Sequence, residues 1–204
     1  MKMNAHVLSI DPGASMGVSL MGPDGTLIGY RELKMRDAEL RSAVIRESVR
    51  RCVASGTDLV VVREKWQAGG PKQRWSTSTI AGLGAAWGIW MEQFRLCAPW
   101  LPKSRFHAVY PSTWRKNVLG AHAKGKEGWA VLAKNYVTSR FDIEDPGPEA
   151  AVAICIGVYA FTSPKVAASA QERPMWHRKL PSKSWDWKVK VSDASVFARR
   201  TDGD

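Results

Sequence analysis

Cysteine is scarce in this chain, and so is every signal that would send it to a membrane or out of the cell. Cys52, Cys97 and Cys155 stand in apolar or helical segments without the spacing of metal ligands, so we expect three buried free thiols in a reducing compartment. No apolar run approaches the roughly 20 residues that a transmembrane helix needs. The first residues lack a long apolar stretch and a small-residue cleavage site, which argues against a signal peptide. These absences predict a cytoplasmic protein without a membrane partner.

Acidic residues are also few relative to basic ones. The chain of 204 residues has 30 Lys and Arg against 19 Asp and Glu, a net charge of +11 that favours a polyanionic partner. The excess is uneven, because residues 63–140 contain 13 basic and 3 acidic side chains, whereas residues 141–162 contain 4 acids and no Lys or Arg. A solvated basic surface would explain the first segment but not the acidic one.

The length of the chain fits one domain with a sizeable core. Regular apolar patterning covers residues 1–162, which we assign to that domain. Beyond it, prolines interrupt the pattern and tryptophans alternate with Lys and Arg, so residues 163–204 form a basic C-terminal extension. Interleaved aromatic and basic residues can stack on bases and pair with phosphates. Docking of these tryptophans on the domain is an equal alternative.

Apolar periodicity within the domain predicts an α/β fold. Turn signals at Pro12-Gly13 and at residues 22–25 separate three strands that we expect to be antiparallel. A β-branched run then indicates a buried parallel strand. The helix before that strand is expected to carry arginines on its outer face, namely Arg41, Arg46, Arg50 and Arg51. The predicted order is strands 7–11, 16–21 and 26–33, helix 37–54, strand 58–62, helix 76–97, strand 105–110, a short helix from 111 to 120, and helices 129–137 and 148–161.

Three carboxylates stand at notable points of these elements. Asp11 ends the first predicted strand, where it is either a turn residue that caps its own backbone or a buried group that needs a cation. Glu64 follows the β-branched strand. Glu149 begins the last helix of the domain behind Pro148, a position that the helix dipole alone would also favour.

Carboxylates in this order resemble those of the RNase H-like fold, and specifically of the RuvC-type Holliday junction resolvases, whose phage-borne branch is most similar. The fold implied is a five-stranded mixed sheet, three antiparallel strands followed by parallel ones, flanked by helices. The resemblance covers roughly residues 5–162. It is carried by Ile10-Asp11-Pro12-Gly13 with a glycine-containing second strand, by residues 61–64, by residues 110–116 with Gly120, Lys124 and Lys126, and by residues 149–157.

The resemblance implies a homodimeric endonuclease that cuts four-way DNA junctions with two Mg²⁺ ions, for which Mn²⁺ would substitute. Such ions prefer carboxylate oxygens and stabilise the attacking water and the leaving 3′ oxygen. Asp11 would bridge both ions, Glu64 and Glu149 would complete the shell, and Asp145 would assist Glu149. Lys124 or Lys126 would contact the phosphate near the scissile bond.

The basic middle of the chain would hold the DNA arms through their phosphates. Trp66 and Trp75 follow the second carboxylate and could stack on unpaired bases, with burial in the core as the alternative for each. The predicted DNA-binding residues are Lys65, Trp66, Lys72, Arg74, Trp75, Arg115, Lys116, Lys124 and Lys126.

One departure from the family pattern leaves a second function open. The family places two acids three residues apart at its last helix. With Glu149 as the first acid the second position is Val152, and with Glu149 as the second the first position is Pro146, next to Asp145. A non-catalytic junction-binding protein on the same fold is therefore the alternative. An actin-like phosphotransferase would also use Asp11-Pro12-Gly13, but it would need a second Gly-rich phosphate loop, which the sequence lacks.

Overall fold

The computed structural model describes residues 3–66, 76–120, 128–170 and 196–197. Several of the predicted DNA contacts lie outside these ranges, namely Lys72, Arg74, Trp75, Lys124 and Lys126.

A five-stranded mixed sheet forms the centre of the fold, with strand order β3-β2-β1-β4-β5. The first three strands are antiparallel neighbours, whereas β4 runs parallel to β1 and β5 runs parallel to β4. The predicted α/β class and mixed sheet are thus confirmed. The strands are β1 (Ala5–Asp11), β2 (Ser15–Met21), β3 (Leu27–Lys34), β4 (Asp58–Glu64) and β5 (Phe106–Val109).

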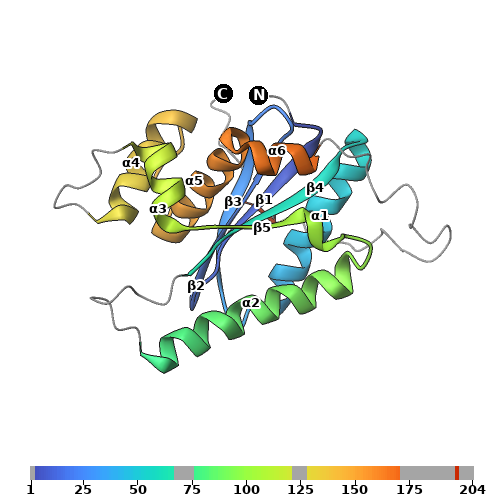
Figure 1. The fold of residues 1–204 in the computed structure, drawn as a ribbon, viewed down its shortest axis with the longest axis horizontal. Helices are drawn as coiled ribbons and strands as arrows, with labels where there is room; N and C mark the ends of the chain where they lie inside the picture. Colours follow the sequence, from blue (N-terminus) through green and yellow to red (C-terminus); the bar gives the residue numbers. More distant parts are fainter. Residues whose placement is uncertain (1–2, 67–75, 121–127, 171–195, 198–204) are drawn as a thin grey trace.

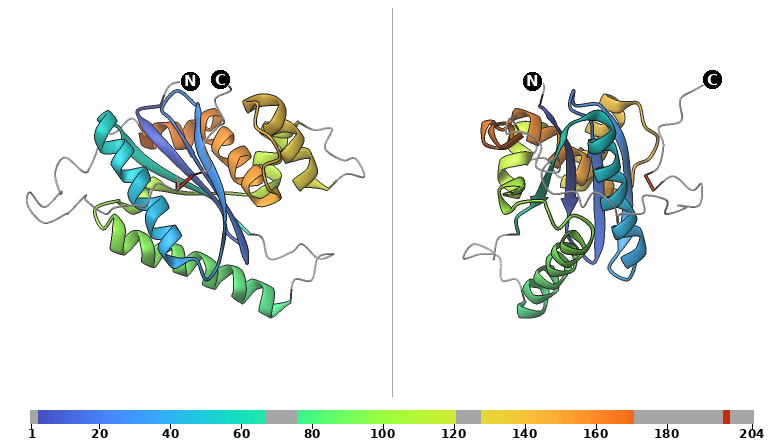
Figure 2. Two further views of the ribbon diagram at one scale, coloured as in Figure 1. Left: turned by 180° about the vertical axis from the view of Figure 1, so that it is seen from behind. Right: turned by 90° about the vertical axis from the view of Figure 1, so that its right-hand side faces the viewer.

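Helices cover both faces of this sheet (Figures 1 and 2). One face packs against α1 (Ala38–Ser55) and α2 (Thr77–Cys97), and a 3₁₀ turn, η1 (Lys103–Arg105), leads from α2 into β5. The other face packs chiefly against α5 (Pro148–Thr162), with α4 (Trp129–Phe141) outside it. The remaining elements on that side are α3 (Pro111–Trp114), a π-helical turn η2 (Arg115–Leu119), and α6 (Pro164–Ala170).

Strand alternation sends successive side chains of β1 to different cores. Leu8 and Ile10 belong to the cluster beneath α1 and α2, whereas Val7 belongs to the cluster beneath α5. Asp11 has the same parity as Val7, so its carboxylate lies on the α5 side of the sheet. The α5 helix is buried along most of its length, which makes it the central helix of that layer.

Helix α6 was not predicted, although it begins at a proline, which is well suited to the first helical position. Val166, Ala167 and Ala170 are buried against the α5 cluster. Val196 and Phe197 are buried in the opposite cluster, beneath α1 and α2. The two described parts of the predicted extension, residues 163–170 and 196–197, therefore contribute to the core.

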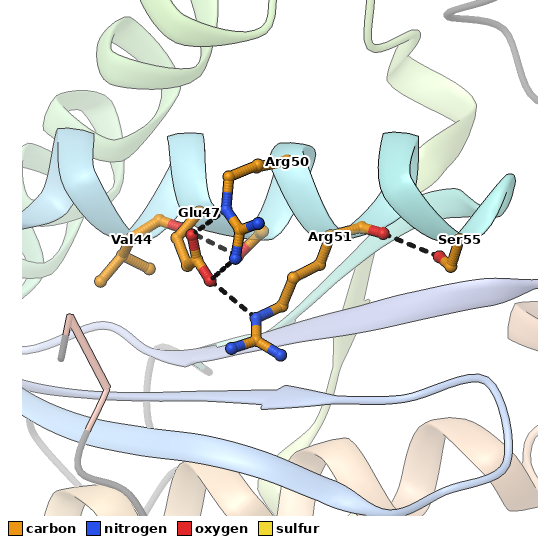
Figure 3. A network of polar contacts seen from close by, with 6 residues as sticks. Val44, Glu47, Arg50, Arg51 and Ser55 are labelled. Carbon is orange, nitrogen blue, oxygen red and sulfur yellow. Dashed lines mark hydrogen bonds and ion pairs between the residues drawn. The ribbon is translucent and has the colours of Figure 1, made fainter. Parts of the chain in front are cut away.

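The prediction for the outer face of α1 was wrong at Arg41. This residue is only 2% exposed, and its guanidinium donates to the carbonyls of Lys34 and Met35 at 3.1 and 2.6 Å. Further along α1, Arg50 and Arg51 both contact Glu47, at 2.6 and 2.8 Å (Figure 3). Much of the positive charge on α1 is thus neutralised or used internally.

A buried ion pair joins the start of β4 to the approach to β5. Arg105 and Asp58 are both 0% exposed, and the guanidinium lies 2.5 Å from the carboxylate. The other carboxylate oxygen of Asp58 accepts the backbone N–H of Leu59 at 2.8 Å. Such pairs are strongly destabilising when one partner is removed, because a buried charge is left uncompensated.

The three cysteines are buried and free, as predicted. Burial raises the pKa of Cys155 to about 12, so this thiol is unreactive at neutral pH. No single helix in the described ranges has the length and apolarity to cross a bilayer. Helices α5 and α6 reach that length and apolarity only when taken together, as a pair bent by 78°.

Candidate functional site

Acidic side chains form one row across the sheet, at the C-terminal ends of β1 and β4. Asp11 pairs with Gly17 across β1 and β2, and Gly17 pairs with Glu32 across β2 and β3. On the other side, Ile10 pairs with Arg63, so the next residues along β1 and β4, Asp11 and Glu64, are neighbours. Directly opposed residues project from the same face of a sheet. Glu32, Asp11 and Glu64 therefore all project towards α5.

The glycine in this row lets α5 approach the sheet. A Cβ atom at Gly17 would overlap the carbonyl of Glu149 and crowd the backbone N of Ala150. Glycine is the residue that permits such close backbone contact. The first turn of α5 consequently rests on β2, which brings Glu149 beside Asp11.

Asp11 is the most strongly perturbed carboxyl group of the site. Burial raises its pKa well above the usual range, and the charges of Glu64 and Glu149 raise it further. A hydrogen bond between the carboxyl groups of Asp11 and Glu149 acts in the same direction, since such a bond needs a proton on one of them. The sequence-predicted acids Asp11, Glu64 and Glu149 are thus brought within electrostatic range of one another.

Glu64 is held by a neighbouring indole. The Nε1–H of Trp114, a residue that is 0% exposed, donates to a carboxylate oxygen of Glu64 at 2.8 Å. Burial raises the pKa of Glu64, while the bond from Trp114 and the charge of Arg115 act against that rise. Trp114 was not predicted as a site residue, and its position in a short helix after β5 gave no separate signal.

Arg115 is the cation of the site. Its guanidinium lies 5.4 Å from the ring centroid of Trp114 and 4.9 Å from that of Trp129, which holds it by cation–π contacts. Burial lowers its pKa, whereas the charges of Glu64 and Asp11 raise it. A predicted DNA contact therefore lies next to the predicted acids.

The structure does not bring Asp145 to the same point. It forms an ion pair with Lys134, and its charge raises the pKa of Tyr30, on which burial has the larger effect. Its backbone has a positive φ of 37°, which fits the turn between α4 and α5. Asp145 is not among the groups that shift the pKa of Asp11.

The other described DNA-contact candidates flank the acids. Lys65 is exposed, and its ammonium group donates to the hydroxyl of Tyr110 at 2.8 Å. Trp66 is half-buried and Lys116 is exposed on η2. The exposed lysines are available to contact a phosphate backbone.

The acids fit a hard divalent cation in their chemistry, because carboxylate oxygens are the ligands that Mg²⁺ and Mn²⁺ prefer and a cation would relieve the mutual repulsion of the acids. However, no group of three or more His, Cys, Asp or Glu residues in the described ranges is arranged so that it could hold a metal ion. The charges of Asp11, Glu64 and Glu149 interact, but their oxygens do not form a complete ligand set.

Searches against protein-family models and against curated proteins found no match for the chain.

Proposed function

We propose that this protein is a metal-dependent, structure-selective endonuclease of RNase H-like fold that resolves four-way DNA junctions. The observation that carries this proposal is the convergence of Asp11, Glu64 and Glu149, from two parallel strands and the start of a helix, beside a fixed arginine. Asp11 and Glu64 stand at the C-terminal ends of β1 and β4, and ligands of open α/β sheets bind outside the C-terminal ends of the strands.

Each residue of the site has a distinct role in this proposal. Asp11, Glu64 and Glu149 would hold divalent cations, which supply charge stabilisation for the attacking water and the leaving 3′ oxygen when bound. Trp114 orients Glu64 by its hydrogen bond. Arg115, in contact with the indoles of Trp114 and Trp129, would offer a charge-assisted contact to the phosphate that enters the site.

The proposed substrate follows from charge and symmetry. A net charge of +11 favours a polyanion, and binding through phosphates is largely independent of sequence. A four-way junction has two equivalent strands to cut, so a homodimer with two-fold symmetry would make paired nicks. Cytoplasmic localisation remains part of this proposal.

Cleavage of a labelled synthetic four-way junction in Mg²⁺ or Mn²⁺ tests the proposal. We expect symmetric nicks from the wild type, and a loss of at least about 100-fold in the cleavage rate of Asp11→Asn and Glu149→Gln, because charge stabilisation worth several kcal/mol is removed. Junction binding should persist in both variants. Glu39→Gln, at an exposed carboxylate on α1, is the matched control and should cut like the wild type.

A second candidate is a junction-binding protein on the same scaffold that does not cut. The specific observation in its favour is that the acids in the described ranges do not form a set that could hold a metal ion. Tight junction binding by the wild type with no cleavage in either metal would favour this candidate over the nuclease.

A further inference from the structure

Glu32, on β3, contacts the helix that carries Glu149. One oxygen of its carboxylate accepts the backbone N–H of Glu149 at 2.9 Å and that of Ala150 at 3.3 Å. These two donors belong to the first turn of α5, where backbone N–H groups have no partner within the helix. The acid acts across a long stretch of sequence, from the third strand to the fifth α-helix.

The first turn of α5 depends on this contact because it has no cap of its own. Its N-cap residue is Gly147, which has no side chain to accept a hydrogen bond, and Pro148 has no N–H. The N–H of Ala151 bonds to the carbonyl of Gly147 at 2.9 Å. Glu32 thus accepts the two remaining donors of the turn.

Two glycines allow the close contacts around this first turn. A Cβ atom at Gly147 would overlap the carboxylate of Glu32, just as one at Gly17 would overlap the backbone of Glu149. Glu32 and Gly17 face each other across β3 and β2, in the same row as Asp11. The position of Glu149 relative to Asp11 is therefore set on one side by Gly17 and on the other by Glu32.

We propose that Glu32 is a positioning residue that fixes the first turn of α5 and so holds the carboxylate of Glu149 towards Asp11 for cation binding. This inference rests on the proposed nuclease function. Glu32 acts through its accepting oxygen and the backbone of Glu149, which separates its role from that of a direct ligand.

Titration with Mn²⁺ alone, followed by the electron paramagnetic resonance signal of the free ion, tests this role. Outer partners of metal ligands usually contribute 10–100-fold to metal affinity, so we expect Glu32→Ala to weaken Mn²⁺ binding by about tenfold or more. Glu32→Gln keeps an accepting oxygen and should stay within about threefold of the wild type. Junction cleavage at limiting Mn²⁺ should follow the same ranking and recover at high Mn²⁺.

Two matched variants separate positioning from a general loss of stability. Ile154→Val, in the buried middle of α5, should lower the melting temperature without changing Mn²⁺ binding. Glu39→Ala, at an exposed carboxylate of α1, should leave Mn²⁺ binding unchanged.

Three results would overturn the inference. Wild-type affinity for Mn²⁺ in Glu32→Ala would overturn it alone, and an equal loss in Glu32→Gln and Glu32→Ala would replace it with a direct ligand role. A wild type that neither binds Mn²⁺ nor cuts junctions would overturn the proposed function as well.

Discussion

At the scale of single residues, the polar groups buried in the sheet are of two kinds. Some pair with a group that neutralises or hydrogen-bonds them, and others lie next to groups of the same charge. Asp58 forms an ion pair with Arg105, and one hydrogen bond of 2.8 Å joins His6 and Thr57. Asp11 instead lies among other carboxyl groups, and burial together with the charges of Glu64 and Glu149 raises its pKa. A buried acid whose neighbours are also acids is a candidate functional group.

His6 should make the stability of the protein depend on pH in a defined window. Burial, assisted by the charge of Arg51, lowers the pKa of His6 to about 4, against about 6.5 in the unfolded chain. Between these values the unfolded state binds a proton that the folded state does not, so the free energy of unfolding falls by about 1.4 kcal/mol per pH unit as the pH drops from 6.5 to 4.

Urea unfolding at pH 7, 5.5 and 4.5 measures this effect of His6. The variant His6→Gln should show a flatter pH dependence than the wild type over this window. The pH dependence of His107→Gln should be compared with it. Burial also lowers the pKa of His107, so this variant should show a flatter pH dependence too. Equal slopes in His6→Gln and the wild type would contradict the prediction.

At the scale of elements, the strands and long helices were predictable because periodicity and turn residues are local signals. What escaped prediction depends on tertiary contacts that periodicity does not reveal. Arg41 is buried because its guanidinium donates to the carbonyls of Lys34 and Met35 at the end of β3, and Glu32 matters because strand register places it opposite Gly17. Asp145 stands one residue from the expected position of the family acid, and in the structure it forms an exposed ion pair with Lys134.

Gly17 should be the least replaceable glycine at the junction of β2 and α5. Gly17→Ala would drive a methyl group into the backbone of Glu149, so we expect a loss of about 1–3 kcal/mol or more in the free energy of unfolding. Gly82→Ala, in α2, meets no atom within 4 Å and should stabilise the protein by about 0.5–1 kcal/mol. Thermal and denaturant unfolding of both variants provides the measurement, and a neutral Gly17→Ala would refute the close contact.

At the scale of the whole molecule, charge governs how the protein would meet DNA. If it contacts six or more phosphates, junction affinity should fall by about 1,000-fold or more between 50 and 200 mM salt. Lys116→Ala, which removes one exposed charge beside the site, should reduce the slope of this dependence by about one. Fluorescence anisotropy with a labelled junction measures both, and an affinity that is insensitive to salt would argue against phosphate contacts.

The row from Asp11 through Gly17 to Glu32 also has a consequence for recognising other chains of this kind. Because strand register fixes which residues face one another, the row appears in the sequence as an acid, a glycine six positions later, and a second acid fifteen positions after that. This spacing is independent of the helix acids on which the family pattern depends. Proteins that share this register and the same two hairpin lengths should therefore keep this spacing between the acid, the glycine and the second acid.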